Sequence, residues 1–196
     1  MIIGSDIDGV LTDLEKYQLV EGEKFYKRPP VNKTGYKTWQ IFGGTLRDDE
    51  DFWAKNIFDY AENYPIKKDA ANVIEKLKND GHKIIFVTAR TYAYTDDYLG
   101  KKMRKTLCDW LDKNGVLYDK IVFSTEDKEE ICMQLKLDLM IEDSPMNVEY
   151  LKKRMPVICM EAGYNLDVKG DNVYRCKDWS KVYETVNKIA KKDKKF

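Results

Sequence analysis

From residue 66 onward the chain alternates short apolar runs with amphipathic segments, and this alternation restricts the fold more than any other feature of the sequence. The runs are rich in β-branched residues and apolar throughout, as in strands of a sheet that is covered on both faces. Between the runs, apolar residues recur at helical spacing. Strands that alternate with helices form right-handed crossovers and a mostly parallel sheet. We therefore predict an α/β fold with three layers, in which helices cover both faces of a mainly parallel sheet.

Local signals assign the elements of this alternation. A first short strand is expected at the apolar start of the chain, before Asp6. Ser144 and Pro145 have the positions of an N-cap and a first helical residue, and glycines end two other helical segments. The basic end of the chain, 191–195, is expected to be solvated. Strands are expected at 83–88, 120–123, 137–142 and 156–160, and helices at 65–81, 95–115, 128–136, 144–154 and 178–192.

Residues 14–65 interrupt the alternation. Thr12 and Glu15 have the spacing of a capping box, which predicts a helix that starts there, and a second helix is expected near the end of the segment. The segment holds 11 of the 24 aromatic residues of the chain, so it can form a small core of its own. We predict a small helical cap at 14–65, inserted after the first strand, and a core that comprises 1–13 and 66–196.

Polar residues follow four of the predicted strands. Asp6, Asp8 and Gly9 come after the first strand, and since aspartate and glycine are poor strand formers, secondary structure does not account for them. Ligands of open α/β sheets bind beyond the carboxyl ends of the strands, and parallel strands share that edge. We therefore expect acids, a hydroxyl and a lysine to meet there. The residues after the other three strands are Thr88, Ala89 and Arg90, then Lys128, and then Glu142 and Asp143.

A cluster of this kind suits phosphoryl chemistry. Neighbouring carboxylates repel one another unless a cation joins them, and a set of oxygen ligands suits Mg²⁺. A hydroxyl, backbone N–H groups and a lysine suit phosphate oxygens. A carboxylate beside the metal can attack phosphorus and form an aspartyl-phosphate, while a second carboxylate protonates the leaving oxygen and then activates water.

Four short motifs also carry a family resemblance. In order, they are Asp6-x-Asp8-Gly9-x-Leu11-Thr12-Asp13, Thr88, Lys128 and Glu142-Asp143. This series resembles the motifs of the haloacid dehalogenase (HAD) superfamily, and the match covers the whole Rossmann-like core. The runs TAR at 88–90 and IEDSP at 141–145 resemble the bacterial relatives of the cytosolic 5'(3')-deoxyribonucleotidases. That family carries a helical cap where the insertion falls in this chain.

The resemblance implies catalytic roles for four of the matched residues and a substrate-binding role for the N–H group of Ala89. Asp6 would be the nucleophile, and Asp8 would be the general acid and base, with its backbone carbonyl on Mg²⁺. Thr88 and the N–H group of Ala89 would hold the phosphate. Lys128 would neutralise the nucleophile and the transferred phosphoryl group.

The resemblance also implies metal and substrate contacts. Asp143 would bind Mg²⁺ directly or through water, beside Asp6 and Asp8. Glu142 stands where an aspartate is often found, and would contact either a metal-bound water or the lysine. Arg90 would bind the substrate, or else pair with one of the aspartates that follow it. Most cap aromatics are expected to form the core of the cap, and a few, including Tyr17 and Trp39, are candidates to stack on a nucleobase.

These roles imply a Mg²⁺-dependent phosphomonoesterase that works through an aspartyl-phosphate intermediate. The favoured substrates are nucleoside or deoxynucleoside monophosphates, as for a 5'-nucleotidase. A phosphatase for sugar phosphates or other small metabolites would use the same chemistry. A non-catalytic protein that binds phosphoesters is the third alternative.

Composition restricts the partners and the compartment. Basic and acidic residues both number 34, so net charge offers no reason to expect polymeric nucleic acid or a membrane surface as a partner. No apolar run approaches the length of a membrane span, and no signal peptide is recognisable. The four cysteines form no CxxC pair, which indicates free thiols in a reducing compartment. We expect a cytoplasmic enzyme whose partner is a small-molecule phosphate monoester.

Overall fold

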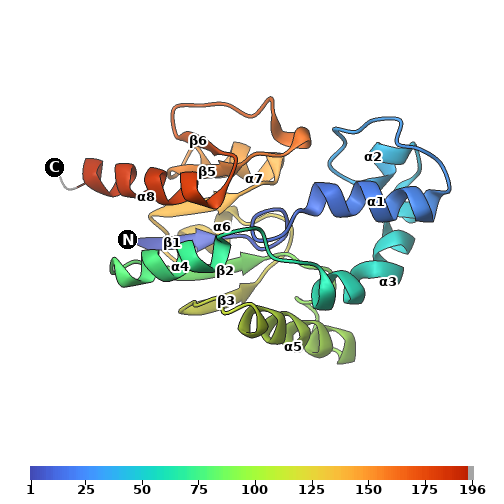
Figure 1. Ribbon diagram of the computed structural model, residues 1–196, viewed down its shortest axis with the longest axis horizontal. Coiled ribbons are helices and arrows are strands. Elements are labelled where there is room, and N and C mark those ends of the chain that lie inside the picture. Colours follow the sequence, from blue (N-terminus) through green and yellow to red (C-terminus); the bar gives the residue numbers. More distant parts are fainter. Residues whose placement is uncertain (194–196) are drawn as a thin grey trace.

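The computed structural model describes residues 1–193, and within them a parallel sheet of six strands forms the centre of the molecule (Figure 1). The strand order is β3-β2-β1-β4-β5-β6, and every neighbouring pair is parallel. The predicted α/β fold with a parallel sheet is therefore confirmed. The strands are β1 (Ile2–Ser5), β2 (Lys83–Thr88), β3 (Lys120–Phe123), β4 (Leu139–Glu142), β5 (Val157–Met160) and β6 (Val173–Cys176).

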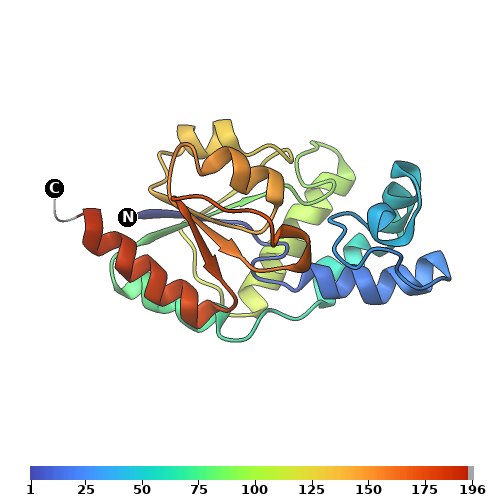
Figure 2. The ribbon, with the colours of Figure 1, turned by 90° about the horizontal axis from the view of Figure 1, so that it is seen from above.

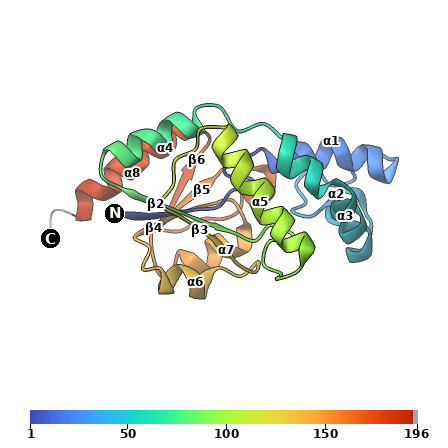
Figure 3. The ribbon, with the colours of Figure 1, turned by 90° about the horizontal axis from the view of Figure 1, so that it is seen from below.

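Helices cover both faces of the sheet, which gives the three predicted layers (Figure 3). Neighbouring residues of β2 illustrate the reason, because Phe86 packs in the core on one face and Val87 in the core on the other. Each fully buried side chain of this size contributes about 1.5–3 kcal/mol of hydrophobic stabilisation. The first face is covered by α4 (Ala70–Asn79), α5 (Tyr98–Lys113) and α8 (Trp179–Asp193), and the second by α6 (Glu129–Gln134) and α7 (Pro145–Leu151).

Three helices inserted after β1 lie beyond the carboxyl ends of the strands, at the end of the molecule opposite the N-terminus (Figures 1 and 2). They are α1 (Leu14–Tyr26), α2 (Thr38–Phe42) and α3 (Leu46–Asn63). Their shared core is aromatic, and the rings of Tyr17 and Tyr60 lie 4.5 Å apart between centroids. Met103 of α5 belongs to the same core, so the insertion packs against the main body. The chain enters and leaves the insertion at one place, because Thr12 and Ile66 form an antiparallel bridge.

The start of α1 differs from the prediction. Its N-cap is Asp13, whose carboxylate accepts a first-turn N–H at 3.1 Å. The hydroxyl of Thr12 instead forms a 2.6 Å hydrogen bond with that of Tyr60 in α3. Glu15 accepts the backbone N–H of Gly163 at 2.9 Å. Both residues of the predicted capping box therefore connect α1 to other elements.

Three short elements were absent from the prediction: α2, β6 and a 3₁₀ turn, η1 (Gly163–Asn165). Short elements depend on tertiary contacts more than on local propensity. Edge strand β6 is only partly buried, and its Arg175 donates to the carbonyl of Asn165 at 2.9 Å. No helix within residues 1–193 is both long and apolar enough to cross a membrane. The basic end predicted at 191–195 lies partly outside the described residues.

Candidate active site

The turn after β1 carries two of the predicted acids. The N–H group of Asp6 donates to the carbonyl of Ile141 at 2.9 Å, so the sheet extends one residue past the strand and holds this aspartate in place. Gly9 follows with φ of 78°, where residues with a Cβ are strained. A Cβ on Gly9 would also overlap the carboxylate of Asp143. The glycine thus lets the two acid-bearing turns approach each other.

Lys128 is the buried cation of the site. It is the N-cap residue of α6, as predicted, and only 1% of its surface is exposed. Its Nζ lies 2.7 Å from Oδ2 of Asp6 and 3.0 Å from Oε2 of Glu142. Burial acts to lower the pKa of Lys128, but the two carboxylates outweigh it, so the pKa is raised and the ammonium stays charged.

Three buried carboxylates surround this ammonium group. Asp6, Glu142 and Asp143 each offer one oxygen, and these oxygens lie within 4.8 Å of one another. Burial raises the pKa of Asp6 well above its ordinary value, and it raises the pKa of Asp143 to about 7 with help from repulsion by Glu142. One lysine therefore does not neutralise the cluster. An all-oxygen donor set with excess negative charge fits a hard divalent cation such as Mg²⁺.

Glu142 also has a structural role. Its Oε1 accepts the N–H groups of Asp143 and Ser144, at 3.2 and 3.0 Å. Ser144 is the N-cap residue of α7, as predicted, but its side chain forms no capping hydrogen bond. Of the two contacts open for Glu142 from the sequence, the ion pair with Lys128 is present. The longer side chain reaches both the lysine and the helix start.

Asp8 is held by a second cation. Nε of Arg90 donates to Oδ2 of Asp8 at 3.1 Å, and a second guanidinium N–H donates to Oδ1. Arg90 is 3% exposed and its guanidinium lies 5.3 Å from the ring centroid of Tyr60. The aspartates that follow Arg90 in sequence have other partners, since Asp97 caps α5. A bidentate, stacked arginine fixes the direction of the Asp8 carboxylate.

Unpartnered polar atoms mark the same region. Among residues 1–193, the buried hydroxyl of Thr88 and the buried NH1 group of Arg90 have no hydrogen-bond partner. Thr88 is the last residue of β2, and Ala89 and Arg90 come next and line a cavity. Buried polar groups are nearly always hydrogen-bonded, so unpaired ones at the end of a strand point to a ligand.

A cavity of about 780 Å³ lies between the insertion and the carboxyl edge of the sheet. The edge of the sheet contributes Asp6, Asp8, Arg90 and Lys128, and the insertion contributes residues of α1, of α3 and of the loop before α2. The structure does not bring Tyr17 or Trp39 to this cavity. Tyr17 belongs to the aromatic core of the insertion, and Trp39 lies on α2, which provides none of the lining residues.

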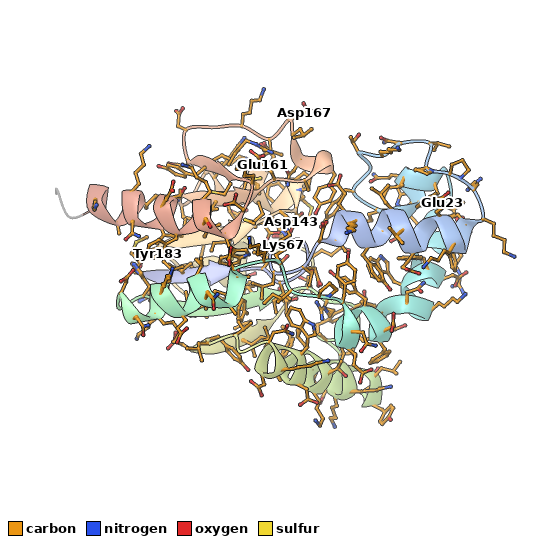
Figure 4. The ribbon with its side chains drawn as sticks, in the orientation of Figure 1. Glu23, Lys67, Asp143, Glu161, Asp167 and Tyr183 are labelled. Atoms are coloured by element: carbon orange, nitrogen blue, oxygen red, sulfur yellow. The ribbon has the colours of Figure 1, made fainter. Side chains whose placement is uncertain are left out.

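Two site residues were missed by the sequence reasoning. The hydroxyl of Tyr164, in η1, donates to Oδ2 of Asp143. Lys67 donates from Nζ to the carbonyl of Gly9 at 2.5 Å, and Figure 4 shows Lys67 and Asp143 together at the centre of the molecule. Tyr164 follows β5, so an inspection of that strand end would have found it. Lys67 could not be found in this way, because it follows a loop and does not follow a predicted strand.

Comparison with known proteins agrees with this geometry. The family described as "5' nucleotidase, deoxy (Pyrimidine), cytosolic type C protein" matches residues 1–193. A protein named nucleotidase from Clostridium acetobutylicum is 28% identical over 191 residues, which are 95% of this chain and 94% of that protein. A proposed 5'(3')-deoxyribonucleotidase of Chlorobaculum tepidum is 26% identical over 95% of this chain and 90% of its own length.

Solved structures show the same fold. The crystal structure of a protein described as a predicted phosphatase, from Clostridium acetobutylicum, has a TM-score of 0.62 at 14% identity, with 95% of this chain and 98% of that chain covered. The D,D-heptose bisphosphate phosphatase of B. bronchiseptica, solved with magnesium and phosphate, has a TM-score of 0.54 at 11% identity, with 96% and 99% covered. From the matched motifs, the sheet and the family match together, this chain belongs to the cytosolic type C deoxy-5'-nucleotidase family.

Proposed function

We propose that the protein is a Mg²⁺-dependent 5'-nucleotidase that hydrolyses nucleoside or deoxynucleoside monophosphates through an aspartyl-phosphate. One observation carries the proposal: Lys128, fully buried, bridges Asp6 and Glu142 beside a third acid, at the floor of a cavity. A buried cation between a nucleophile and a metal-binding cluster is suited to a transferred phosphoryl group. The names of the curated relatives support the nucleotide as substrate.

In the first step, Asp6 attacks phosphorus and the ester oxygen leaves. A magnesium ion held by Asp6, Asp143 and the backbone carbonyl of Asp8, with Glu142 nearby, would supply positive charge for the phosphoryl oxygens. The ion pair with Lys128 opposes the rise that burial causes in the pKa of Asp6, and the ammonium group neutralises charge on the transferred group.

Residues at the carboxyl end of β2 bind the phosphate group of the substrate. The unpaired hydroxyl of Thr88 and the N–H group of Ala89 would donate to oxygens of the phosphoryl group. Arg90 contributes its remaining N–H donors to the substrate. These donors hold the phosphoryl group in line with the nucleophile.

Asp8 moves the protons. It protonates the departing ester oxygen in the first step, and in the second it takes a proton from the water that attacks the aspartyl-phosphate. The bidentate contact with Arg90 holds the Asp8 carboxyl group in a fixed orientation towards the cavity. The products are the nucleoside and inorganic phosphate, and Asp6 is regenerated.

The insertion acts as a cap over the site. We assign 14–65 to the cap and 1–13 with 66–196 to the catalytic core, and closure of the cap excludes water during phosphoryl transfer. The four cysteines carry free thiols, which suits a cytoplasmic enzyme. The substrate is a small phosphate monoester.

Phosphate release from a panel of nucleoside monophosphates and sugar phosphates tests this function, with Mg²⁺ and with EDTA. Asp6→Asn should reduce turnover at least about a thousandfold while the fold, followed by circular dichroism, is unchanged. The control is Asp112→Asn, which changes an exposed aspartate of α5 and should keep full activity. Turnover that survives Asp6→Asn or EDTA would refute the mechanism, and a preference for sugar phosphates would refute the substrate assignment.

A further inference from the structure

An unpaired amide faces the catalytic residues from the cap side of the cavity. Gln18, in the second turn of α1, is 3% exposed and lines the same cavity as Asp6 and Asp8. Its Oε1 is buried, and no residue of the described chain, 1–193, gives it a hydrogen bond. Neither the mechanism nor the fold of the cap uses this side chain.

The buried position of the Gln18 amide destabilises the ligand-free protein. A buried amide oxygen without a donor loses its hydrogen bonds to water and gains none in return. A leucine or methionine would fill the same place without that loss, and Leu14, one turn earlier on α1, lines the same cavity. Since the amide satisfies nothing within the chain, its partner is best sought in the ligand.

The surroundings of Gln18 restrict what this ligand can be. Leu14, Trp53 and Ile57 line the cavity beside it, and Tyr36 lines it from the loop before α2. The charged residues Lys37 and Glu50 line other parts of the same cavity. Apolar and aromatic side chains that accompany a free amide suit a flat heterocycle with a few polar atoms at its edge.

Asp49, which also lines the cavity, is hydrogen-bonded within the protein. Oδ1 of Asp49 accepts the N–H and the hydroxyl of Thr38, at 2.9 and 2.5 Å. These bonds tie the start of α2 to α3 and account for the buried carboxylate. Gln18 has no comparable contact, which distinguishes it as the free polar group of the wall.

We propose that Gln18 determines substrate specificity by reading the edge of the nucleobase. A carboxamide presents one acceptor and one donor side by side, and it pairs with a base edge that offers a neighbouring donor and acceptor. The ligand class is therefore a nucleotide with an intact base, as opposed to a phosphorylated sugar. This inference rests on the proposed nucleotidase function and adds the residue that recognises the base.

The test compares substrates with and without a base. For wild type and Gln18→Met, kcat/KM is measured for the four common ribonucleoside 5'-monophosphates, their deoxy forms and ribose 5-phosphate. The ratio of the best nucleotide to ribose 5-phosphate should fall roughly 10- to 100-fold in Gln18→Met, as expected for two lost hydrogen bonds. Gln134→Met, at an exposed position on α6, is the matched control and should keep the wild-type ratio.

A stability readout separates recognition from a structural role. Because the amide oxygen is unpaired in the free protein, Gln18→Met should melt no lower than wild type, whereas an amide that supported the fold would lower the melting temperature. Gln18→Asn keeps an amide but withdraws it by one methylene, and should show the same selective loss if the methionine variant does not fold.

The outcomes distinguish this inference from the function on which it rests. Nucleotide hydrolysis with an unchanged ratio in both Gln18 variants would overturn the inference and leave the nucleotidase assignment intact. No hydrolysis of any nucleotide by wild type would overturn both. A selective fall in the ratio without loss of melting temperature would establish Gln18 as the base-reading residue.

Discussion

Replacement of Asp143 by asparagine should stabilise the metal-free protein at neutral and alkaline pH, although it removes a residue of the active site. Burial and repulsion by Glu142 raise the pKa of Asp143 from 3.8 to about 7 in the folded protein. In the unfolded chain the same carboxyl ionises near its ordinary value. The folded state therefore retains a proton that the unfolded state releases, and ionisation of Asp143 works against folding.

The size of the effect follows from the shift. A pKa difference of about 3 corresponds to about 4 kcal/mol at pH 8, where both states have ionised. At pH 5 less than half of this penalty is present, because folded Asp143 is still protonated while the unfolded carboxyl is mostly ionised. The amide that replaces the carboxyl in the variant carries no charge at any pH. The stability difference between variant and wild type should thus grow by roughly 2–3 kcal/mol from pH 5 to pH 8, which corresponds to a rise of several degrees in melting temperature for a chain of this length.

The assay is thermal and urea unfolding in EDTA at several pH values, with Asp112→Asn as control. The sign is fixed by the raised pKa: the advantage of Asp143→Asn is small at pH 5 and increases as pH rises through 7. Added Mg²⁺ should reverse the order, since a cation that binds only the folded state stabilises wild type by mass action and the variant has lost a ligand.

Three outcomes would contradict this reasoning. If Asp143→Asn were less stable than wild type at pH 8 in EDTA, the carboxylate would not be an electrostatic burden on the fold. If Mg²⁺ raised the melting temperature of both proteins equally, Asp143 would not belong to the metal site. A constant difference across pH would point to packing as the cause.

Two further substitutions test the geometry of the site. Gly9→Ala should destabilise the protein more than Gly81→Ala, because both glycines have positive φ but only a Cβ at Gly9 would overlap a neighbour, the carboxylate of Asp143. In urea denaturation, the free energy of unfolding should fall by about 1–2 kcal/mol in the Gly81 variant and by more in the Gly9 variant. Equal losses in the two variants would contradict the close approach of Gly9 and Asp143. Arg90→Met should lower kcat roughly 10- to 100-fold because Asp8 loses its bidentate clamp; steady-state kinetics that showed only a higher KM would assign the arginine to substrate binding alone.

The sheet and the strand-end cluster could be predicted because their signals are local. Continuous apolar runs require two covered faces, and parallel strands place their carboxyl ends together. These two rules bring Asp6, Lys128 and Asp143 to one place without knowledge of the loops. The start of α1 could not be predicted in the same way, since Thr12 and Glu15 satisfy the local pattern of a capping box yet bond to Tyr60 and to η1.

The cap side of the cavity was the least predictable part. Aromatic residues in a small helical insertion serve either its core or its ligand, and spacing along the chain does not separate the two uses. Tyr17 packs against four other rings, which places it in the core of the insertion. Gln18, the next residue, faces the cavity instead. The distinction depends on how α1 is rotated against α3, and that rotation is decided by tertiary packing.

The pairing of each acid in the first motif with a different cation explains how two aspartates, two residues apart, can have different tasks. Lys128 is a compact charge on a flexible stem, shared between Asp6 and Glu142, so its ammonium group can turn from the nucleophile to the transferred phosphoryl group without leaving the cluster. Arg90 donates two N–H groups to Asp8 and stacks on an aromatic ring. These contacts fix the direction of the Asp8 carboxylate and allow the guanidinium little movement. A nucleophile needs a partner that moves with the charge, whereas a proton carrier needs one that holds it in position. Exchange of the two cations, by Lys128→Arg and Arg90→Lys, should therefore fail to support turnover even though the net charge of the site is unchanged.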